Sequence, residues 1–403
     1  MVNDQQPKKQ YKPIFNRTYL KYLGFVVAIV IILLSKKAPT PLDQPQAVTA
    51  INPVLHVLKA EDLAQQRLFL SFNTSPALSS QHKIERELAY QALHKATKTS
   101  SVVFAALWTF DRLELELRWS PDQKFDIKQT LHTFFTDSTN NINDQDRKII
   151  AASQYLEDQA DDTVLLNALE QRIAYNLATP TPLSQILSIT PSALLITDED
   201  SSQQQLVQVE QQLLAMFPRA PIELPESIDY QQSTSTLYTN SSEHKLLIAS
   251  QIKMQTNLQS SIDLLSHFML SDILSSQQTQ FGFYFRLVRK PIYYNGYQAI
   301  ILTTNNAMPE QLKAQLLATI DIDVIDKRLT KIKERLLDAY SDLIDNQDRL
   351  FSLYSKKLFY GFETQSKSLY EEQLDSISDE KIMQQLQYLL GDQTTSIYLK
   401  PNL

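Results

Sequence analysis

The sequence predicts an α+β protein in which two tandem repeats follow an N-terminal transmembrane helix. Three observations lead to this fold class. Twelve uninterrupted apolar residues, Leu23–Leu34, stand near the start of an otherwise polar chain of 403 residues. Leucines alternate with charged residues between Leu113 and Trp119, as in a strand. Strand and helix patterns then recur in a similar order on either side of a proline-rich segment, residues 218–225.

The apolar run predicts a membrane anchor. It is shorter than the roughly 20 residues of a spanning helix, but extending it back to Tyr19 gives a segment, residues 19–35, with one charge, Lys21. A lysine there can reach the lipid headgroups. Positive charges gather before the run, at Lys8, Lys9, Lys12, Arg17 and Lys21, and only Lys36 and Lys37 follow it. Because the more positive side stays in the cytoplasm, we expect a single-pass plasma-membrane protein with the bulk of its chain in a bacterial periplasm.

A cleaved signal peptide is the alternative to this anchor. Cleavage needs small residues at two nearby positions after the apolar run, and residues 35–39 (SKKAP) depart from that pattern. We therefore expect an uncleaved signal anchor, with residues 1–18 forming a cytoplasmic N-terminus. Residues 36–50 hold three prolines and no apolar period, which predicts a linker.

The first repeat is expected over residues 51–220. Alternation of apolar and charged residues from Leu113 to Trp119 predicts a strand with one face in water. Apolar residues three and four apart predict helices, and short apolar runs predict strands. In chain order the expected elements are a strand at 68–72, helices at 82–96, a strand at 113–119, helices at 127–135, 144–155 and 163–177, a buried strand at 192–197 and a helix at 203–217.

The second repeat is expected over residues 221–403. Its longest predicted helix, residues 323–358, rests on apolar residues at steps of three and four from Ile325 to Leu343. The other expected elements are a strand at 246–252, a helix at 258–274, a strand at 299–304, a helix at 309–319 and a strand at 395–399. Two halves of similar size and element order indicate an internal duplication.

Composition excludes several classes of chemistry. The chain has no cysteine, which removes thiol nucleophiles, disulfides and thiolate metal sites. Only five glycines are present, and they form none of the glycine-rich nucleotide-binding motifs or the G-x-S-x-G nucleophile elbow. The net charge of −7 argues against a nucleic-acid partner.

Three segments resemble one family of peptidases. They are LSQILSITPSALLITDEDSSQQQLVQVEQQLLAMFP at residues 183–218, YFRLVRKPIYYNGYQAIILTTN at residues 284–305, and the closing residues 348–390. In these segments the chain resembles the insulinase/pitrilysin-type zinc metallopeptidases, which include the mitochondrial processing peptidase. The resemblance implies that each repeat is a mostly antiparallel sheet with helices packed on one side.

The resemblance also locates a degenerate zinc motif. In the family, H-x-x-E-H on a helix of the first repeat supplies two zinc ligands and the general base, and a glutamate about 75 residues further on is the third ligand. Residues 87–100 (ELAYQALHKATKTS) match the motif best. Tyr90 then replaces the first histidine, Leu93 replaces the glutamate, and His94 remains, with Glu170 lying 76 residues after His94. His94 and Glu170 are relics of the site, or a helix histidine and a surface carboxylate.

A second register starts at His82 and keeps the glutamate, Glu85, but places Arg86 at the second histidine. An arginine cannot ligate zinc, and its charge repels the ion. Both registers are broken, so we expect no catalytic residue, no bound metal and no cofactor. Zinc enters only under the alternative that His82, Glu85, His94 and Glu170 converge to form a weak or rearranged zinc peptidase.

A substrate-holding pair is the remaining part of the family's site. Arg286 and Tyr293 have the seven-residue spacing of the arginine and tyrosine that hold the substrate carbonyl in active members. The resemblance implies that both bind substrate here. The alternative is that Arg286 pairs with a carboxylate and Tyr293 packs in the core.

The leading hypothesis is a membrane-anchored, non-catalytic relative of these peptidases. It would bind peptides or unfolded protein, or scaffold an active peptidase subunit of the same family. The expected partners are therefore that subunit, a peptide, and the lipid bilayer through residues 19–35. A weak zinc peptidase and a cell-envelope assembly protein that reuses the fold are the alternatives.

Overall fold

The computed structural model describes residues 48–402, apart from short gaps at 61–62, 122, 124, 141, 174–181, 199–202, 218–232, 253–255, 291–295, 308–310 and 392. The chain divides into two units, Met1–Gln44 and Pro45–Leu403. The predicted cytoplasmic segment, the predicted anchor at 19–35 and most of the predicted linker lie outside the described residues. Within the part that is described, no helix is long and apolar enough to span a membrane.

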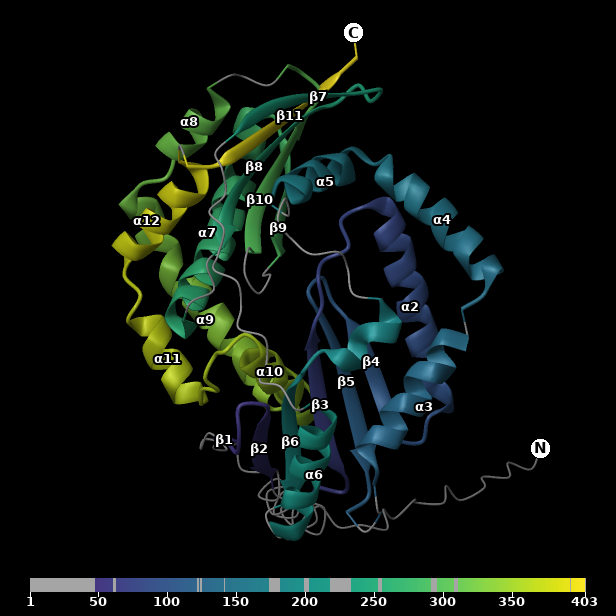
Figure 1. Cartoon of the computed structure of the whole chain (residues 1–403). Coiled ribbons are helices and arrows are strands. Elements are labelled where there is room, and N and C mark those ends of the chain that lie inside the picture. Colours follow the sequence, from purple (N-terminus) through teal and green to yellow (C-terminus); the bar gives the residue numbers. More distant parts are fainter. Residues whose placement is uncertain are drawn as a thin grey trace, which may run out of the picture. The chain divides into compact units, whose positions relative to one another are not determined.

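The first half contains the predicted elements and three strands that were not predicted, β1, β2 and β4. Thr49 and Ala50, expected in the linker, form β1 and pair with Val57 and His56 of β2. In chain order (Figure 1) the elements are β1 Thr49–Ala50, β2 Leu55–Ala60, β3 Gln66–Asn73, α2 Ser80–Thr99, β4 Val103–Trp108, β5 Arg112–Trp119, α3 Ile127–Asn140, α4 Asp144–Asp158, α5 Asp161–Ile173, a 3₁₀ helix Leu183–Ser188, β6 Ser192–Asp198 and α6 Gln203–Met216.

The second half follows the same plan. The predicted helix at 323–358 is wrong as one element, because it is two helices. The first ends at Ile344, and Asn346 caps the second by accepting a hydrogen bond from the Arg349 backbone N–H at 3.1 Å. The elements are β7 Thr234–Thr239, β8 His244–Ile252, α7 Asn257–Phe281, β9 Tyr284–Lys290, β10 Gly296–Thr304, α8 Leu312–Ala318, α9 Ile322–Ile344, α10 Gln347–Phe359, α11 Lys367–Asp375, α12 Asp379–Leu390 and β11 Thr395–Pro401.

Strand order shows that the two halves are repeats. The first sheet runs β1-β2-β6-β3-β5-β4 and the second β7-β11-β8-β10-β9. Without β1, the second sheet repeats the first strand for strand. In each sheet the first strand pairs in parallel with the last strand of its half, β2 with β6 and β7 with β11, and the other pairs are antiparallel. The predicted tandem α+β repeats with mostly antiparallel sheets are therefore confirmed.

Each sheet buries one face against the helices of its own half. In the first sheet Leu68, Leu70 and Phe72 alternate toward a core that includes α2, α3 and α6. In the second, Leu246 and Ile248 face a core built with α7, α9 and α12. Helix α7 ends at Gly282, whose φ of 65° is the left-handed conformation that glycine adopts most readily.

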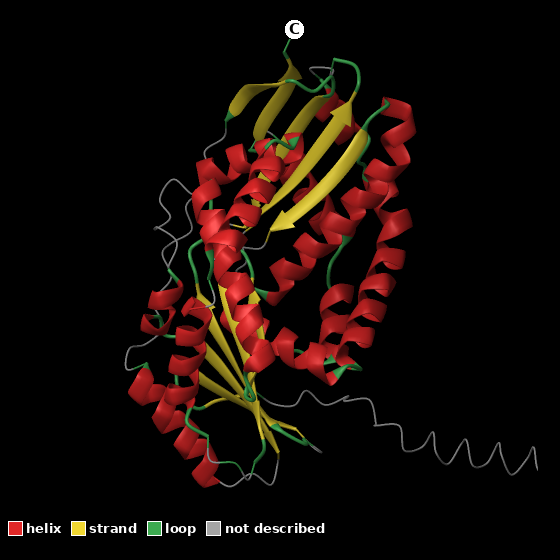
Figure 2. Ribbon diagram, turned by 90° about the vertical axis from the view of Figure 1, so that its right-hand side faces the viewer, coloured by secondary structure: helices red, strands yellow, loops and turns green. Residues whose placement is uncertain are grey.

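The opposite face of each sheet is covered by a helix from the other half, so the expectation of helices on one side only is wrong. Leu165 and Leu169 of α5, from the first half, pack on Leu247 and Tyr297 of the second sheet. In return, α10 of the second half packs on Phe69 of the first sheet. Figure 2 shows helices beside both faces of the sheets. This exchange buries apolar side chains that each repeat alone would expose to water.

The exchange also explains why the predicted water-exposed face of Leu113–Trp119 is buried. Glu114 is only 5% exposed, because α10 covers it and Ser355 donates a hydrogen bond of 2.9 Å to its carboxylate. Next along the strand, Glu116 accepts a hydrogen bond of 2.6 Å from Arg118. Alternation in the sequence identified the strand, but Glu114 is buried under a helix, and Glu116 and Arg118 are paired with each other and only partly exposed.

Candidate functional site

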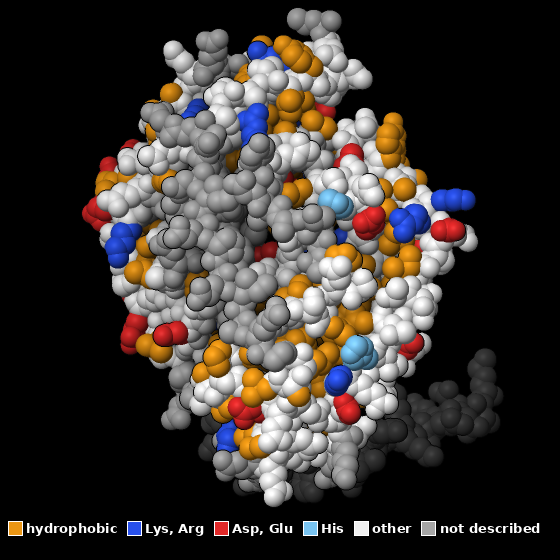
Figure 3. Space-filling view, in the orientation of Figure 1, with side chains coloured by type: hydrophobic (Ala, Val, Ile, Leu, Met, Phe, Trp, Pro, Cys, Tyr) orange, Lys and Arg blue, Asp and Glu red, His pale blue; other side chains and the backbone are white. Residues whose placement is uncertain are grey.

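A cavity of about 570 Å³ lies where α2, α4 and α5 of the first half meet β9 of the second. Its residues combine three basic side chains, three carboxylates and three aromatic rings. On the described face drawn in Figure 3, basic and acidic side chains are also interspersed. The charged and aromatic residues that line the cavity are Lys83, Arg86, Lys290, Glu87, Glu157, Glu170, Tyr90, Trp108 and Phe110.

Helix α2 contributes one stripe of the cavity. The helix begins after Ser79, whose hydroxyl accepts a hydrogen bond of 3.2 Å from the His82 backbone N–H. Residues three and four apart on a helix share a face, and this places Lys83, Arg86, Glu87 and Tyr90 toward the cavity. Apolar residues on the other side of α2 pack on the first sheet.

Glu170 is the most constrained charge of the cavity. It is 4% exposed, so it is not the surface carboxylate of one sequence interpretation. The Lys290 ammonium donates to one carboxylate oxygen at 2.5 Å, and the Tyr297 hydroxyl donates to the same oxygen at 2.7 Å. Lys290 also lies 4.7 Å from the centre of the Phe110 ring. Through Lys290 and Tyr297, Glu170 thus joins α5 of the first half to β9 and β10 of the second.

The two basic residues that α2 contributes to the cavity donate hydrogen bonds to neutral partners. Lys83 donates to the Asn167 side-chain oxygen at 2.5 Å. Arg86 donates to the Phe110 carbonyl at 2.8 Å and lies over the Trp108 ring, 5.4 Å from its centre. Burial lowers the pKa of Arg86 to about 10, against the opposing attraction of Asp111. Arg86 therefore remains cationic at neutral pH.

The residues of the best-matching motif register do not share one site. Tyr90 and Glu170 line the cavity. Leu93 is fully buried in the core beneath the first sheet, and His94 is exposed to solvent. Three other α2 residues that line the cavity, Lys83, Arg86 and Glu87, have the spacing of H-x-x-E-H and lie seven residues before Tyr90, Leu93 and His94. Seven residues are about two helical turns, so His94 lies beyond the part of α2 that lines the cavity.

The residues of the rearranged site are also dispersed. His82 and Glu85 line a separate cavity of about 170 Å³ beside Arg86. Glu170 lines the larger cavity, and His94 lines neither. The four residues His82, Glu85, His94 and Glu170 therefore do not converge.

The substrate-holding pair can be followed only in part. Arg286 on β9 is 59% exposed, and its guanidinium donates to the Asp162 carboxylate of α5 at 3.1 Å. The same carboxylate accepts from Lys245 at 2.8 Å. Desolvation raises the pKa of Asp162, but hydrogen bonds and attraction from Lys245 and Arg286 outweigh it and lower the pKa overall. Tyr293 lies outside the described residues.

The side chains present do not fit a zinc ion. Zinc sites use imidazole nitrogen, thiolate or carboxylate ligands, whereas the cavity carries Lys83, Arg86 and Lys290 and no histidine among its lining residues. Its buried carboxylate is already bound to a lysine and a tyrosine. Over the described parts of the chain, no group of three histidines, aspartates or glutamates is arranged to hold a metal.

Sequence reasoning gave Lys83 and Lys290 no role, and it treated Arg86 only as the residue that breaks the second motif register. A signal for the α2 residues exists, because Lys83, Arg86 and Glu87 repeat the motif's spacing with altered residue types. The histidine that survives in the best-matching register, His94, lies two turns further along the helix and is not among the residues that line the cavity. Lys290 reaches the cavity from the second half, and Tyr297 of the same half binds the buried Glu170, so both roles follow only from how the repeats pack.

No family model matches the sequence, and no curated protein matches it. Solved structures do match. A peptidase M16 inactive domain from Pseudomonas fluorescens has a TM-score of 0.61 at 14% identity, over 89% of this chain and 98% of that one. The first half of the periplasmic protease PqqL from Escherichia coli has a TM-score of 0.54 at 13% identity, over 89% and 93%. The ferredoxin protease FusC, in complex with Arabidopsis ferredoxin, has a TM-score of 0.55 at 13% identity, over 87% and 44%.

These matches define the class of protein by its fold. The chain has the fold of the M16 peptidases, as the resemblance to insulinase-type enzymes implied. The M16 domains with this fold include one described as inactive.

Proposed function

We propose that this chain is a membrane-anchored, non-catalytic M16-like protein of the periplasm that holds peptides or scaffolds an active peptidase. The fold supports the M16 part of this proposal, and the apolar segment at residues 19–35 supports the anchor. Orientation across the membrane rests on the basic residues that precede this segment.

The single observation on which the non-catalytic role rests is that Glu170 is already bound by other side chains. Its carboxylate binds the Lys290 ammonium and the Tyr297 hydroxyl. Lys83 and Arg86 add two further cations to the same cavity. A divalent ion there would have to displace the lysine and approach three positive side chains, which is electrostatically unfavourable. The cavity is therefore stable with its own charges and needs no metal.

Peptide binding is supported by the edge of the first sheet. Strand β4 is the last strand in the sheet order, and its Trp108 lines the cavity. Phe104 and Leu107 of the same strand are exposed. An extended peptide can add to a sheet edge through main-chain hydrogen bonds while side-chain pockets select its residues. The ferredoxin protease with this fold was solved in complex with a protein, which further supports peptide binding here.

Two measurements on the full-length chain in neutral detergent test the catalytic part. We expect no stoichiometric zinc by elemental analysis after incubation with zinc and removal of free ions. We also expect no hydrolysis of an unfolded peptide. Stoichiometric zinc together with cleavage would overturn the proposal.

A pair of tyrosine variants tests the peptide-holding part. Tyr90 lines the cavity, whereas Tyr238 on β7 is exposed on the second sheet. We expect Tyr90→Ala to weaken the binding of a labelled unfolded peptide several-fold in fluorescence anisotropy. Tyr238→Ala should bind like the parent. Equal affinities for all three proteins would contradict peptide binding at this cavity.

Crosslinking in intact cells separates scaffolding from a role in envelope assembly. A scaffold should crosslink to a zinc-containing peptidase of the same fold. Recovery of envelope-assembly proteins without any peptidase would favour the alternative.

A further inference from the structure

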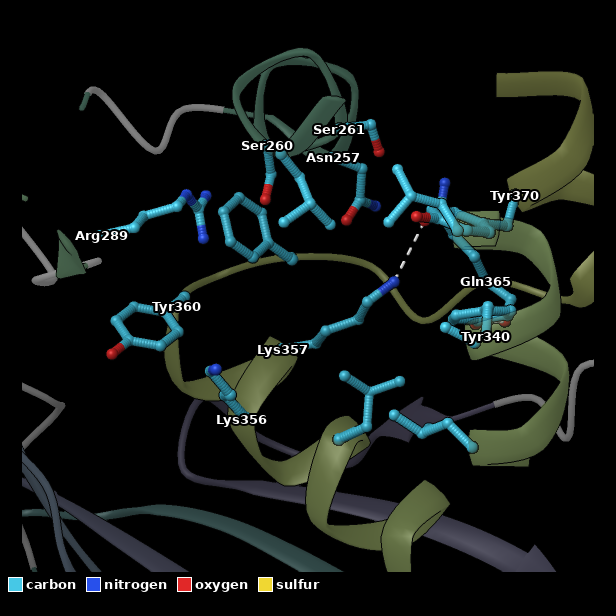
Figure 4. A pocket seen from close by; sticks show the side chains of 16 residues that line it. Asn257, Ser260, Ser261, Arg289, Tyr340, Lys356, Lys357, Tyr360, Gln365 and Tyr370 are labelled. Atoms are coloured by element: carbon cyan, nitrogen blue, oxygen red, sulfur yellow. Dashed lines mark hydrogen bonds between the residues drawn. The ribbon is translucent and has the colours of Figure 1, made fainter. Parts of the chain in front are cut away.

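A second cavity, of about 290 Å³, lies within the second repeat. It is enclosed by α7, α9, the C-terminal turn of α10 and the residues that lead to α11, with one side chain from β9 (Figure 4). Its position is away from the α2 cavity, and the two share no lining residue. Most of its wall is apolar, formed by Leu264, Leu336, Leu343, Leu353, Phe362 and Tyr370.

The charged side chains in this wall are all cationic, and they stand beside neutral polar groups such as Asn257, Ser260 and Gln365. Arg289 of β9 and Lys356 and Lys357 of α10 enter the cavity from two different elements. Among the described residues that line it, none is an aspartate or a glutamate. Lys357 donates to the Gln365 side-chain oxygen at 3.1 Å and lies 6.0 Å from the centre of the Tyr340 ring. Neither partner carries a formal charge that would neutralise the ammonium.

Arg289 is the least satisfied of the three. Its Nε and Nη2 atoms are buried and have no hydrogen-bond acceptor among the described residues. Asp263 of α7 attracts Arg289 electrostatically, but its carboxylate is not a hydrogen-bond partner of the guanidinium among the described residues. The Asp263 carboxylate instead accepts from Gln259 and Gln385, each at 3.0 Å. Burying guanidinium N–H groups without an acceptor is costly, so Nε and Nη2 of Arg289 reduce the stability of the fold.

The helix dipole explains only part of this cluster. Lys356 and Lys357 lie in the last turn of α10, where positive charge is favourable. Arg289 comes from a strand and gains nothing from that helix end. Burial, followed by repulsion from Arg112 and Arg289, lowers the pKa of Lys356, although part of its side chain reaches solvent. Burial also lowers the pKa of Lys357 to about 8. Lys356 and Arg289 therefore repel each other, while Lys357 is destabilised by burial in the same cavity.

We propose that this cavity binds a small organic carboxylate that carries an aromatic or aliphatic body. The head group accepts hydrogen bonds from Arg289 and the two lysines, and the body packs against the leucines and aromatic rings. Apolar pockets with a few convergent polar groups are the usual form of small-molecule sites. Arginine in particular matches the planar geometry of a carboxylate.

Isothermal titration of the full-length chain in neutral detergent tests the proposal with three matched probes. 4-Phenylbutyrate has the anionic head and the apolar body, 4-phenylbutylamine has the same body with a cationic head, and acetate has the head alone. We expect binding of 4-phenylbutyrate only. Equal binding of the acid and the amine would overturn the proposal, as would no binding of the acid at millimolar concentration.

Variants of the lining residues test whether 4-phenylbutyrate binds in this cavity. We expect Arg289→Gln to weaken 4-phenylbutyrate binding at least tenfold and Lys357→Met several-fold. Lys331→Met on the exposed side of α9 is the matched control and should bind like the parent. Leu353→Trp fills the apolar part and should abolish binding, and it keeps the proposal testable if Arg289→Gln fails to fold. Undiminished binding by Lys357→Met and Leu353→Trp would refute the assignment. Peptide binding at the α2 cavity is measured separately, so either proposal can fail alone.

Discussion

One cavity lies beside α2 and the other beside α7, which are corresponding helices of the two repeats. Three basic side chains line each cavity. The two cavities differ in whether carboxylates balance the positive charges of these basic side chains. The first cavity also holds three carboxylates, one of them bonded to Lys290, whereas the lining residues of the second include none. Duplication therefore preserved the framework while the charges of the two sites diverged. A balanced site is stable by itself, and an unbalanced one is stabilised by an anion from outside.

The largest expected effect breaks the feature that the two repeats share, the exchanged helix. Phe351 of α10 and Leu169 of α5 are both almost fully buried on the sheet of the other repeat. We expect Phe351→Ala to lower the free energy of unfolding by about 3–5 kcal/mol and Leu169→Ala by about 2–5 kcal/mol, because each leaves a cavity. Urea denaturation measures both.

The control for these variants is a helix residue outside the exchange, Leu369→Ala on α11, which is exposed. It should change the free energy of unfolding by less than about 0.5 kcal/mol. Small effects of Phe351→Ala and Leu169→Ala as well would mean that the repeats do not depend on the exchanged helices.

The next prediction concerns pH and the carboxyl group near the second cavity. Asp263 is 1% exposed, and burial, opposed by a Gln259 hydrogen bond and by Arg289, raises its pKa to about 6. The folded protein binds this proton more tightly than the unfolded chain, whose aspartate pKa is about 4. Protonation of Asp263 therefore adds to the free energy of unfolding, and this contribution is fully present below pH 4. It is lost as the pH rises through about 6, by roughly 3 kcal/mol.

Denaturation curves between pH 4 and pH 7 measure this loss. The Asp263→Asn variant should lack that component of the pH dependence, since an amide does not titrate. An unchanged pH profile in this variant would assign the dependence to other groups.

The charge pair of the first cavity should give the next effect. Glu170→Ala removes the buried carboxylate to which both Lys290 and the Tyr297 hydroxyl donate. We expect a loss of about 2–3 kcal/mol in the free energy of unfolding. Asp272→Asn, which removes a solvent-exposed pair with Arg328, is the control and should cost less than about 1 kcal/mol. Equal losses would show that the Glu170 pair is no stronger than a surface pair.

The smallest effect has the opposite sign and sharpens the contrast between the cavities. Lys357 in the second cavity has no carboxylate partner among the described residues, and burial lowers its pKa. We expect Lys357→Met to raise the free energy of unfolding by about 1 kcal/mol, because an uncompensated charge is removed and its apolar stem is kept. Thermal unfolding without added anion measures the change. A destabilised variant would show that this lysine supports the fold.

The sequence predicted most strands and helices of both repeats, but its errors share a cause. Periodicity reports which side of an element is apolar, and it identified the strand at Leu113–Trp119 and the apolar face of α9. It could not report that α10 would cover Glu114 or that Asn346 would end one helix and begin another. Strands β2, β4, β7 and β9 were missed because short mixed runs carry a weak periodic signal.

The candidate sites depended still more on tertiary structure. The sequence located α2 as the helix of interest, but Glu170, Lys290 and Tyr297 come together from elements of both repeats. The second cavity had no sequence signal, because Arg289 and Lys357 are isolated basic residues until β9 and the end of α10 lie side by side.

Taken alone, the sequence determined that two α+β repeats form, that the H-x-x-E-H pattern is broken, and that cysteine chemistry is absent. Those conclusions need only residue types and local spacing, which any segment carries within itself. Only the tertiary structure decided which helix covers which sheet and which buried charges are paired. Burial and pairing are properties of contacts between distant segments, and their free energies depend on surroundings that no single segment contains.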